Sequence, residues 1–258
     1  MKLTVLLENT ASCPEVEAEH GLSLFIETDC HKILFDMGQS DLFARNADAL
    51  GVDLTSADLA VLSHGHYDHG GGLARFLEVN SHAPVYVNPH VFEPHYNGTE
   101  KYIGLDTALA GNPRLRTAHN GLQIGEGLTL YTADGRKKQH SLGAFGLMME
   151  KDGVLIPEDF RHEQYLLIEE AGRRILVSGC SHNGILDILE WFAPDVLLGG
   201  FHFTKLSPGK ELADAAAFLN RFPTQYYTCH CTGTEQYAFL RERMENLHYI
   251  ACGDRITI

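Results

Sequence analysis

Basic residues are scarce in this sequence. Its 258 residues include 20 Lys and Arg against 34 Asp and Glu, and the formal net charge is -14 with histidine neutral. A surface this acidic repels nucleic-acid phosphates at long range, so we do not expect nucleic-acid binding. The one basic trio, residues 136–138, is typical of a solvated turn. A substrate phosphate stays compatible with this charge if a metal centre reverses the local field.

Paired cysteines and long apolar runs are also missing. The six cysteines form no CxxC pair, and the chain is long for a disulfide framework. This pattern predicts reduced thiols and a cytoplasmic location. The first largely apolar run, residues 3–7, is too short for a signal peptide or a membrane span. We therefore expect a first β-strand there and no membrane association.

Linkers and low-complexity segments are absent as well, so nothing marks a domain boundary. With 44 % hydrophobic residues, the chain fits one large α/β domain spanning residues 1–258. A core of that size needs no structural metal, and any bound metal is therefore expected to be functional.

Candidate strands alternate with candidate helices along most of the chain. Apolar runs predict strands at residues 3–7, 22–28, 32–35, 59–62, 174–178, 195–198 and 225–228. Helical spacing is found at residues 41–50, 73–79, 183–192, 207–222 and 233–244, with Ser207 and Pro208 opening the fourth of these. Residues 81–159 are interpreted as a loop-rich segment that shapes the substrate pocket.

Histidine, with 15 copies, is placed where such a fold gathers ligands. Four predicted strands are each followed by a histidine just beyond the C-terminal end, namely His64, His182, His202 and His230. In layered α/β sheets the strand ends collect ligands, so these side chains are expected at one edge.

The strongest chemical signal is the group His64, His66, Asp68 and His69. Imidazole nitrogen and carboxylate oxygen suit zinc, iron and manganese. His64 and His66 lie two residues apart on a turn and can point to one centre, whereas Asp68 and His69 face a second centre beside it. The group therefore predicts two divalent metal ions, with zinc favoured and manganese or iron as alternatives.

Residues 63–73 resemble the HxHxDH signature of the metallo-β-lactamase superfamily. Five more segments resemble one branch of it, the proteins similar to 7,8-dihydropterin-6-yl-methyl-4-(β-D-ribofuranosyl)aminobenzene-5′-phosphate synthase: residues 19–23, 34–40, 178–185, 199–202 and 229–233. The resemblance spans nearly the whole chain. It implies an αβ/βα sandwich with the metals at one edge.

The resemblance also implies a ligand set. His64, His66, Asp68 and His69 would be ligands, with Asp68 and His69 serving the second metal, and His230 matches the final ligand of the superfamily. Many members carry a bridging Asp where this chain has Gly-Cys-Ser-His at residues 179–182. Either Cys180 or His182 replaces that carboxylate, with His182 favoured, or the bridge is absent.

Other candidates stay open. His202 is either a ligand or substrate contact, or a structural histidine. His162 precedes a strand as another superfamily ligand does, but a structural role is favoured, as it is for His90, His95, His119 and His140 in the middle segment. His20, like its neighbour Glu19, could reach the site or stabilise a turn. Asp36 could orient a ligand histidine or cap a turn.

The sequence lacks the GxSxG, GxxxxGK[ST] and HExxH templates. We therefore expect metal-assisted hydrolysis of an ester, phosphoester or lactone bond in a small molecule, with Asp68 taking part in proton transfer. The branch resemblance implies an alternative, a synthase that condenses a ribofuranosylaminobenzene phosphate with a pterin pyrophosphate on the same metals. A binding or sensor module is disfavoured because the ligand set is intact.

An anion site is also predicted. Residues 232–235 have the pattern of a capping box, with Thr232 at the N-cap and Glu235 at the third helical position. A helix N-terminus favours anions, and Lys205 would add a cation on the same rim. Thr232, Lys205 and His202 are therefore the expected contacts for a phosphate or carboxylate of the substrate, unless Thr232 merely caps the helix.

Overall fold

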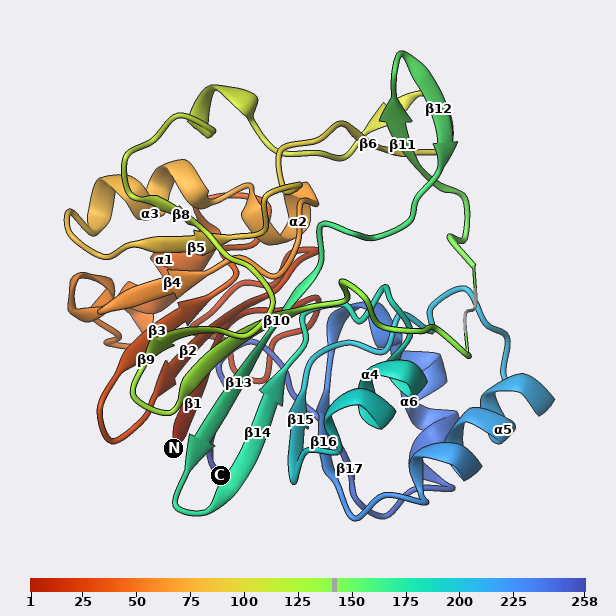
Figure 1. Cartoon of the computed structure of the whole chain (residues 1–258). Helices are drawn as coiled ribbons and strands as arrows, with labels where there is room; N and C mark the ends of the chain where they lie inside the picture. The colour runs from red at the N-terminus through yellow and green to blue at the C-terminus, as the bar shows by residue number, and fades with distance from the viewer. Residues whose placement is uncertain (141–142) are drawn as a thin grey trace.

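The computed structural model describes residues 1–140 and 143–258 as a four-layered sandwich, helix–sheet–sheet–helix (Figure 1). The αβ/βα expectation is confirmed. The first sheet has the order β18 (Arg255–Thr257), β1 (Lys2–Leu7), β2 (Ser23–Glu27), β3 (Lys32–Phe35), β4 (Leu59–Val61), β5 (Val85–Val87) and β8 (Leu115–Thr117). The second sheet has the order β17 (Leu247–Tyr249), β16 (Gln225–Thr228), β15 (Val196–Leu198), β14 (Arg173–Val177), β13 (Gln164–Glu170), β10 (Leu128–Thr132) and β9 (Leu122–Gly125).

Helices cover the outer face of each sheet. α1 (Leu42–Ala49) and α3 (Leu73–Val79) lie on the first sheet, and α4 (Ile185–Phe192), α5 (Lys210–Leu219) and α6 (Thr234–Arg241) lie on the second (Figure 1). Short helical turns complete the chain: η1 (Leu54–Ser56), α2 (Tyr67–Gly70), η2 (Thr107–Leu109) and η3 (His230–Thr232).

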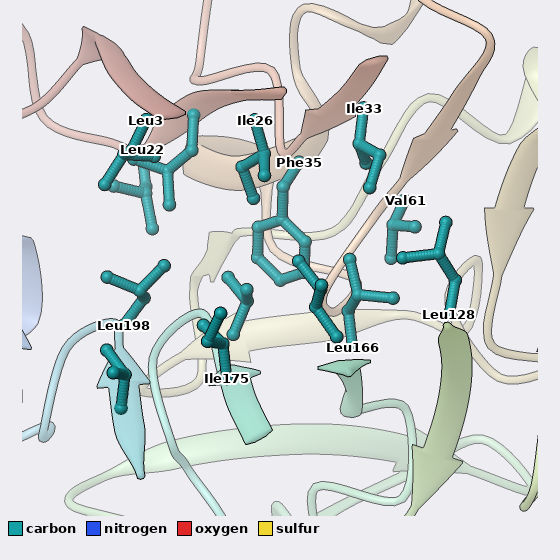
Figure 2. Close-up of a cluster of buried hydrophobic side chains, with 14 of the residues drawn as sticks. Leu3, Leu22, Ile26, Ile33, Phe35, Val61, Leu128, Leu166, Ile175 and Leu198 are labelled. Carbon is teal, nitrogen blue, oxygen red and sulfur yellow. The ribbon is translucent and has the colours of Figure 1, made fainter. Parts of the chain in front are cut away.

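The main core lies between the two sheets. Side chains of the first sheet such as Phe35 and Val61 face Leu166, Ile175 and Leu198 of the second, and all five are at most 2 % exposed (Figure 2). Strand residues alternate between faces, so the neighbours of Leu166 on β13 pack instead against the helices. Each such buried side chain contributes roughly 1.5–3 kcal/mol, which makes the sandwich stable through its apolar core.

Each sheet contains a block of neighbouring parallel strands. β3, β4 and β5 are parallel neighbours in the first sheet, as are β14, β15, β16 and β17 in the second. Their C-terminal ends therefore meet at one edge of the sandwich, and the turns that follow them carry the site.

The middle of the chain differs from expectation. Residues 81–159 contain the eight short strands β5 to β12, which the sequence did not predict, although most of the segment lies between strands as expected. Four of them form a third sheet beyond the edge of the sandwich, in the order β12 (Val154–Pro157), β11 (Leu147–Lys151), β6 (His95–Asn97) and β7 (Lys101–Tyr102) (Figure 1). These strands have two to five residues, too few for a clear alternation in the sequence.

Two helix starts also differ. The helix expected from Ser207 begins at Lys210, after Gly209 at the N-cap, so Ser207 and Pro208 lie outside it. The helix expected from Asn183 begins at Ile185. Gly184, with φ of 99°, is its N-cap, so Asn183 belongs to the turn before the helix. Within the described residues, no helix is long and apolar enough to cross a membrane.

Candidate metal centre

A first group of histidines converges at this edge. His64 and His66 follow β4 and His182 follows β14, and their ligand atoms lie within 4.8 Å of one another. The Nε2 atoms of His64 and His66 and both ring nitrogens of His182 are buried without a hydrogen-bond partner among the described residues. An unpaired buried polar group costs about 1–3 kcal/mol, so three converging lone pairs fit a cation.

These three histidines are in the form that binds metals. Burial, the largest cause in each case, lowers the pKa of His64, His66 and His182 well below the ordinary value. The imidazoles are therefore neutral near pH 7, and each has a lone pair to offer.

A second group lies beside the first. His69 Nε2 is 3.2 Å from His230 Nε2, and the Asp68 carboxylate oxygen Oδ2 is 3.3 Å from His230 Nε2 and 4.0 Å from His69 Nε2. Two imidazole nitrogens and a carboxylate oxygen so close together form a donor set suited to zinc. The chain thus brings Asp68, His69 and His230 together as expected, although they are up to 162 positions apart (68 to 230).

Asp68 carries its negative charge in this setting. Burial alone would raise its pKa, but hydrogen bonds from His20 and His230 outweigh burial and hold the pKa well below its usual range. His20 Nε2 lies 3.1 Å from Asp68 Oδ2 at the rim, where more than half of the His20 side chain is exposed. His20 therefore reaches the site, one of the two roles left open for it.

Asp36, at the end of β3, orients two ligand histidines. Its Oδ2 accepts hydrogen bonds from His69 Nδ1 (2.6 Å) and Ser63 Oγ (2.8 Å), and the Ser63 oxygen in turn accepts from His64 Nδ1 (2.7 Å). With both Nδ1 atoms acting as donors, the Nε2 lone pairs of His64 and His69 are left for a metal. The geometry thus gives Asp36 the orienting role rather than simple turn capping.

The same carboxylate sets the proton affinity of His69. Burial, the largest cause, would lower the pKa of His69, but the charge and hydrogen bond of Asp36 together outweigh it and raise that pKa to about 9. Metal binding at His69 must therefore displace a proton.

The first loop of the chain orients His230. His230 Nδ1 donates to Asn9 Oδ1 at 2.8 Å, and the Gly21 amide donates to the same oxygen. The backbone amide of His230 donates to Glu8 Oε1 at 2.6 Å. Sequence reasoning missed Glu8 and Asn9, because nothing in a polar pair after a strand signals contact with a residue more than 200 positions away.

Cys180 and His182 both reach the site, but in different places. His182 joins the first group, whereas Cys180 Sγ lies 3.1 Å from His69 Nε2 and groups with His64 and His69. The two residues are therefore not alternatives for one position. Cys180 thus lies close to one histidine of each group, His64 and His69.

Comparison with known proteins agrees with this geometry. A family model described as the metallo-beta-lactamase superfamily matches residues 16–219. The chain belongs to the metallo-β-lactamase superfamily.

Relatives and solved structures resemble nearly the whole chain. An uncharacterized protein of Methanocaldococcus jannaschii is 29 % identical, with 90 % of each chain covered. The same organism's 7,8-dihydropterin-6-methyl-4-(beta-D-ribofuranosyl)-aminobenzene-5′-phosphate synthase is 26 % identical, covering 92 % of this chain and 89 % of that protein. The crystal structure of Tm1679, described as a metal-dependent hydrolase of the beta-lactamase superfamily, has a TM-score of 0.87 at 27 % identity and covers 100 % of this chain and 99 % of Tm1679.

Zn²⁺-bound PqqB from Methylobacterium extorquens shares only the fold. Its structure covers the whole of both chains with a TM-score of 0.63, at 13 % identity.

His162 contacts the backbone of the turn that carries His64 and His66. Its Nδ1 accepts a hydrogen bond from the Gly65 amide at 2.8 Å, which leaves its own hydrogen on Nε2. An Nε2 that carries hydrogen cannot bind a metal, so the geometry favours a structural role, in which His162 holds the peptide between His64 and His66. His95, fully buried on β6, donates to Glu158 Oε2 at 2.7 Å beside it; sequence reasoning missed Glu158.

A pocket of about 420 Å³ opens over both groups. Its wall includes His202 and Lys205 from the segment after β15 and Lys101 and Phe145 from the third sheet and its approach. Lys101 was not anticipated from the sequence, since its segment gave no signal of lying near the metals. Both lysine side chains bring positive charge to the pocket of an otherwise acidic protein.

The expectation for Thr232 and Glu235 is wrong. Gly233, not Thr232, is the N-cap of α6, and no side chain caps the helix. Thr232 is fully buried, where its hydroxyl accepts from the Phe201 amide at 2.8 Å and bonds Thr228, and it does not line the pocket. These hydrogen bonds connect the turns after β15 and β16, so the Thr232 hydroxyl is not available to a substrate.

Proposed function

We propose that this protein is a dinuclear metal-dependent hydrolase that cleaves an ester, phosphoester or lactone bond in an anionic small molecule. The observation that carries the proposal is the pair of adjacent ligand groups, His64, His66 and His182 beside Asp68, His69 and His230, on the floor of one pocket. When bound, two divalent ions supply a water of near-neutral pKa and polarise the bond to be cleaved. The nitrogen and oxygen donors favour zinc, with iron or manganese as alternatives.

The residues around the ions would orient them and handle protons. Asp36, Ser63 and Asn9 hold the ligand rings in the orientation that presents Nε2. Asp68 would hold the second ion, and its contact with His20 gives a released proton a route from the pocket floor to solvent.

Lys101 and Lys205 support an anionic substrate. They line the same pocket as the ligand groups, in a chain whose net charge is -14. Two cations in a pocket of an acidic protein favour a phosphate or carboxylate group.

A synthase is the second candidate, because the relative that is 26 % identical over 92 % of this chain carries the name of one. In that reaction a pyrophosphate would leave, and the same lysines would bind it. The two functions need the same residues and differ in the substrates consumed.

The decisive experiment combines metal analysis with a substrate screen. Purified protein is expected to contain close to two transition-metal ions per chain and to release product from a phosphomonoester, phosphodiester or lactone. Turnover only with a pterin pyrophosphate plus a ribofuranosylaminobenzene phosphate would establish the synthase instead. Absence of metal after preparation and after soaking would refute both.

A further inference from the structure

Three turns that follow three neighbouring parallel strands place Cys180, His202 and Cys231 together. Cys180 follows β14, His202 follows β15 and Cys231 follows β16, and these strands lie side by side in the second sheet. The two Sγ atoms and a ring nitrogen of His202 all lie within 4.8 Å of one another. Tetrahedral zinc with bonds of about 2.3 Å to sulfur needs ligand atoms roughly 3.5–4 Å apart, so small inward shifts suffice.

The contacts that His202 and Cys231 already make leave both side chains able to bind a ligand. His202 Nδ1 is buried and has no hydrogen-bond partner in the described part of the chain. Cys231 Sγ makes a 3.3 Å hydrogen bond to the carbonyl oxygen of Cys180 and also hydrogen-bonds with the Cys180 and His202 side chains, so these contacts stay within the cluster, and thiol hydrogen bonds are weak. All three residues line the pocket, so a ligand can reach them from solvent.

The backbone is built to bring the three side chains together. His202 has φ of 54° and Ser181, next to Cys180, has φ of 60°, a conformation that L-residues rarely adopt. A Cβ on Gly200 would lie 2.3 Å from Cys231 Sγ, so the glycine makes room for the sulfur. Cys229, two residues before Cys231, does not line the pocket. It is fully buried in the apolar core between the sheets.

We propose that Cys180, His202 and Cys231 form a third cation position, selective for a thiophilic divalent ion such as zinc or cadmium. Cys180 would be shared with the adjacent pair of ligand groups through its contact with His69. Sulfur ligands select soft metals, and a position with three protein ligands keeps room for one more. A cysteine binds such an ion as its thiolate, so any proton still on a thiol is released on binding. The site does not depend on which reaction the other groups support.

Cobalt substitution tests the proposal by a spectroscopic signal. Metal-free protein titrated with Co²⁺ is expected to develop a near-ultraviolet sulfur-to-cobalt charge-transfer band and to bind about three ions. Cys231→Ala should reduce the band by about half, since one of two thiolates is gone, and bind about two ions. His202→Ala should keep both sulfurs but weaken the cobalt that gives the band by at least about tenfold. Cys229→Ala, the matched control, should leave band and stoichiometry unchanged.

The outcomes separate this proposal from the proposed function. A band that keeps its full intensity in Cys231→Ala and disappears in Cys180→Ala would overturn the proposal, because the sulfur would then belong to the dinuclear pair alone. Two bound ions with no band would also overturn it and leave the dinuclear site standing, whereas no bound ions would refute the proposed function as well. If a variant fails to fold, alkylation of the unmodified protein decides: Zn²⁺ should protect Cys180 and Cys231 together, and protection of Cys180 alone contradicts the proposal.

Discussion

At the scale of the residue, the site depends on which nitrogen of each histidine carries the hydrogen. An acceptor next to Nδ1 fixes a hydrogen there for His64, His69 and His230, so Nε2 is the nitrogen that faces the metal position. A donor next to Nδ1 does the opposite for His162. One hydrogen bond therefore separates a histidine suited to metal binding from a supporting one only a few ångströms away.

Asp68→Asn tests the second ligand group. The amide keeps the shape but loses the charge, so the second metal should weaken first and turnover should fall at least about a hundredfold with the fold intact. Metal content and turnover are measured together. Asp48→Asn, an exposed position on α1, is the control. Near-normal turnover in Asp68→Asn would contradict a two-metal mechanism.

Lys205→Ala and Lys101→Ala test the anionic substrate. Inorganic phosphate and pyrophosphate should inhibit competitively, and each substitution should raise the inhibition constant several-fold, on the order of 1 kcal/mol per lost ion pair. Lys210→Ala, exposed and paired with Asp214, should leave inhibition unchanged. If phosphate and pyrophosphate do not inhibit the unmodified protein, a neutral substrate such as a lactone becomes the better candidate.

At the scale of the element, the turns after the parallel strands carry both the site and the backbone strain. Asp36, Ser181, His202 and His230 follow β3, β14, β15 and β16, and all have φ between 48° and 60°. Such conformations cost roughly 1–3 kcal/mol each and persist only where surrounding contacts hold them. Buried carboxylates supply such contacts at three of these turns: Asp36 itself bonds Ser63 and His69, Glu163 accepts from the His182 amide beside Ser181, and Glu8 accepts from the His230 amide.

Asp36→Asn should weaken metal binding without touching a metal ligand. The two carboxylate oxygens accept from the Ser63 amide, Ser63 Oγ and His69 Nδ1, but an amide nitrogen in place of either oxygen accepts no hydrogen bond, so this network is broken and the His69 ring loses its fixed orientation. Affinity for the second metal is expected to fall about 10–100-fold, measured by competition with a chelator. Asp53→Asn, an exposed cap of η1, should not change it. Unchanged affinity in Asp36→Asn would show that the ligand rings need no such partner.

Glu163→Gln should loosen the turn after β14. Glu163 accepts hydrogen bonds from the amides of His182 (2.6 Å) and Asn183 (2.9 Å) and from the Tyr165 hydroxyl (2.7 Å). A glutamine turns its NH₂ group toward one of these donors and leaves it unsatisfied, so the free energy of unfolding should fall by about 1–3 kcal/mol. Denaturant titration measures this. Glu169→Gln, largely exposed on β13, the strand that follows Glu163, should change it by less than about 0.5 kcal/mol.

At the scale of the whole molecule, the sandwich and the metals are separable. The core between the sheets and the two helix-facing cores are apolar, and none of the ligand residues belongs to them. Removing metal with a chelator should therefore leave far-ultraviolet circular dichroism unchanged. Adding Zn²⁺ back at a hundredfold excess over Kd should raise the free energy of unfolding by about 2.7 kcal/mol per site. Collapse of the spectrum on chelation would mean that the metals are structural.

The sequence by itself determined the fold class, the first ligand cluster and most central strands. Strands 32–35 and 225–228 and the helix at 73–79 were predicted with their observed bounds, because uninterrupted apolar periodicity encodes them locally. The HxHxDH cluster was visible because its spacing is local too. The small third sheet was not, since strands of two to five residues are defined by their partners rather than by their own pattern.

Only the tertiary structure decided which residues distant in the sequence contact one another at the site. It separated Cys180 from His182, gave His162 a supporting role, brought Asn9 to His230 and Lys101 to the pocket, and removed Thr232 from it. Most of these contacts join turns that become neighbours only when the two sheets pack together. The hydrogen-bond partners of His162 and His230 lie 97 and 221 positions away and leave no trace in local periodicity, so the tautomers of these histidines, and hence their roles, are fixed only when the sheets pack.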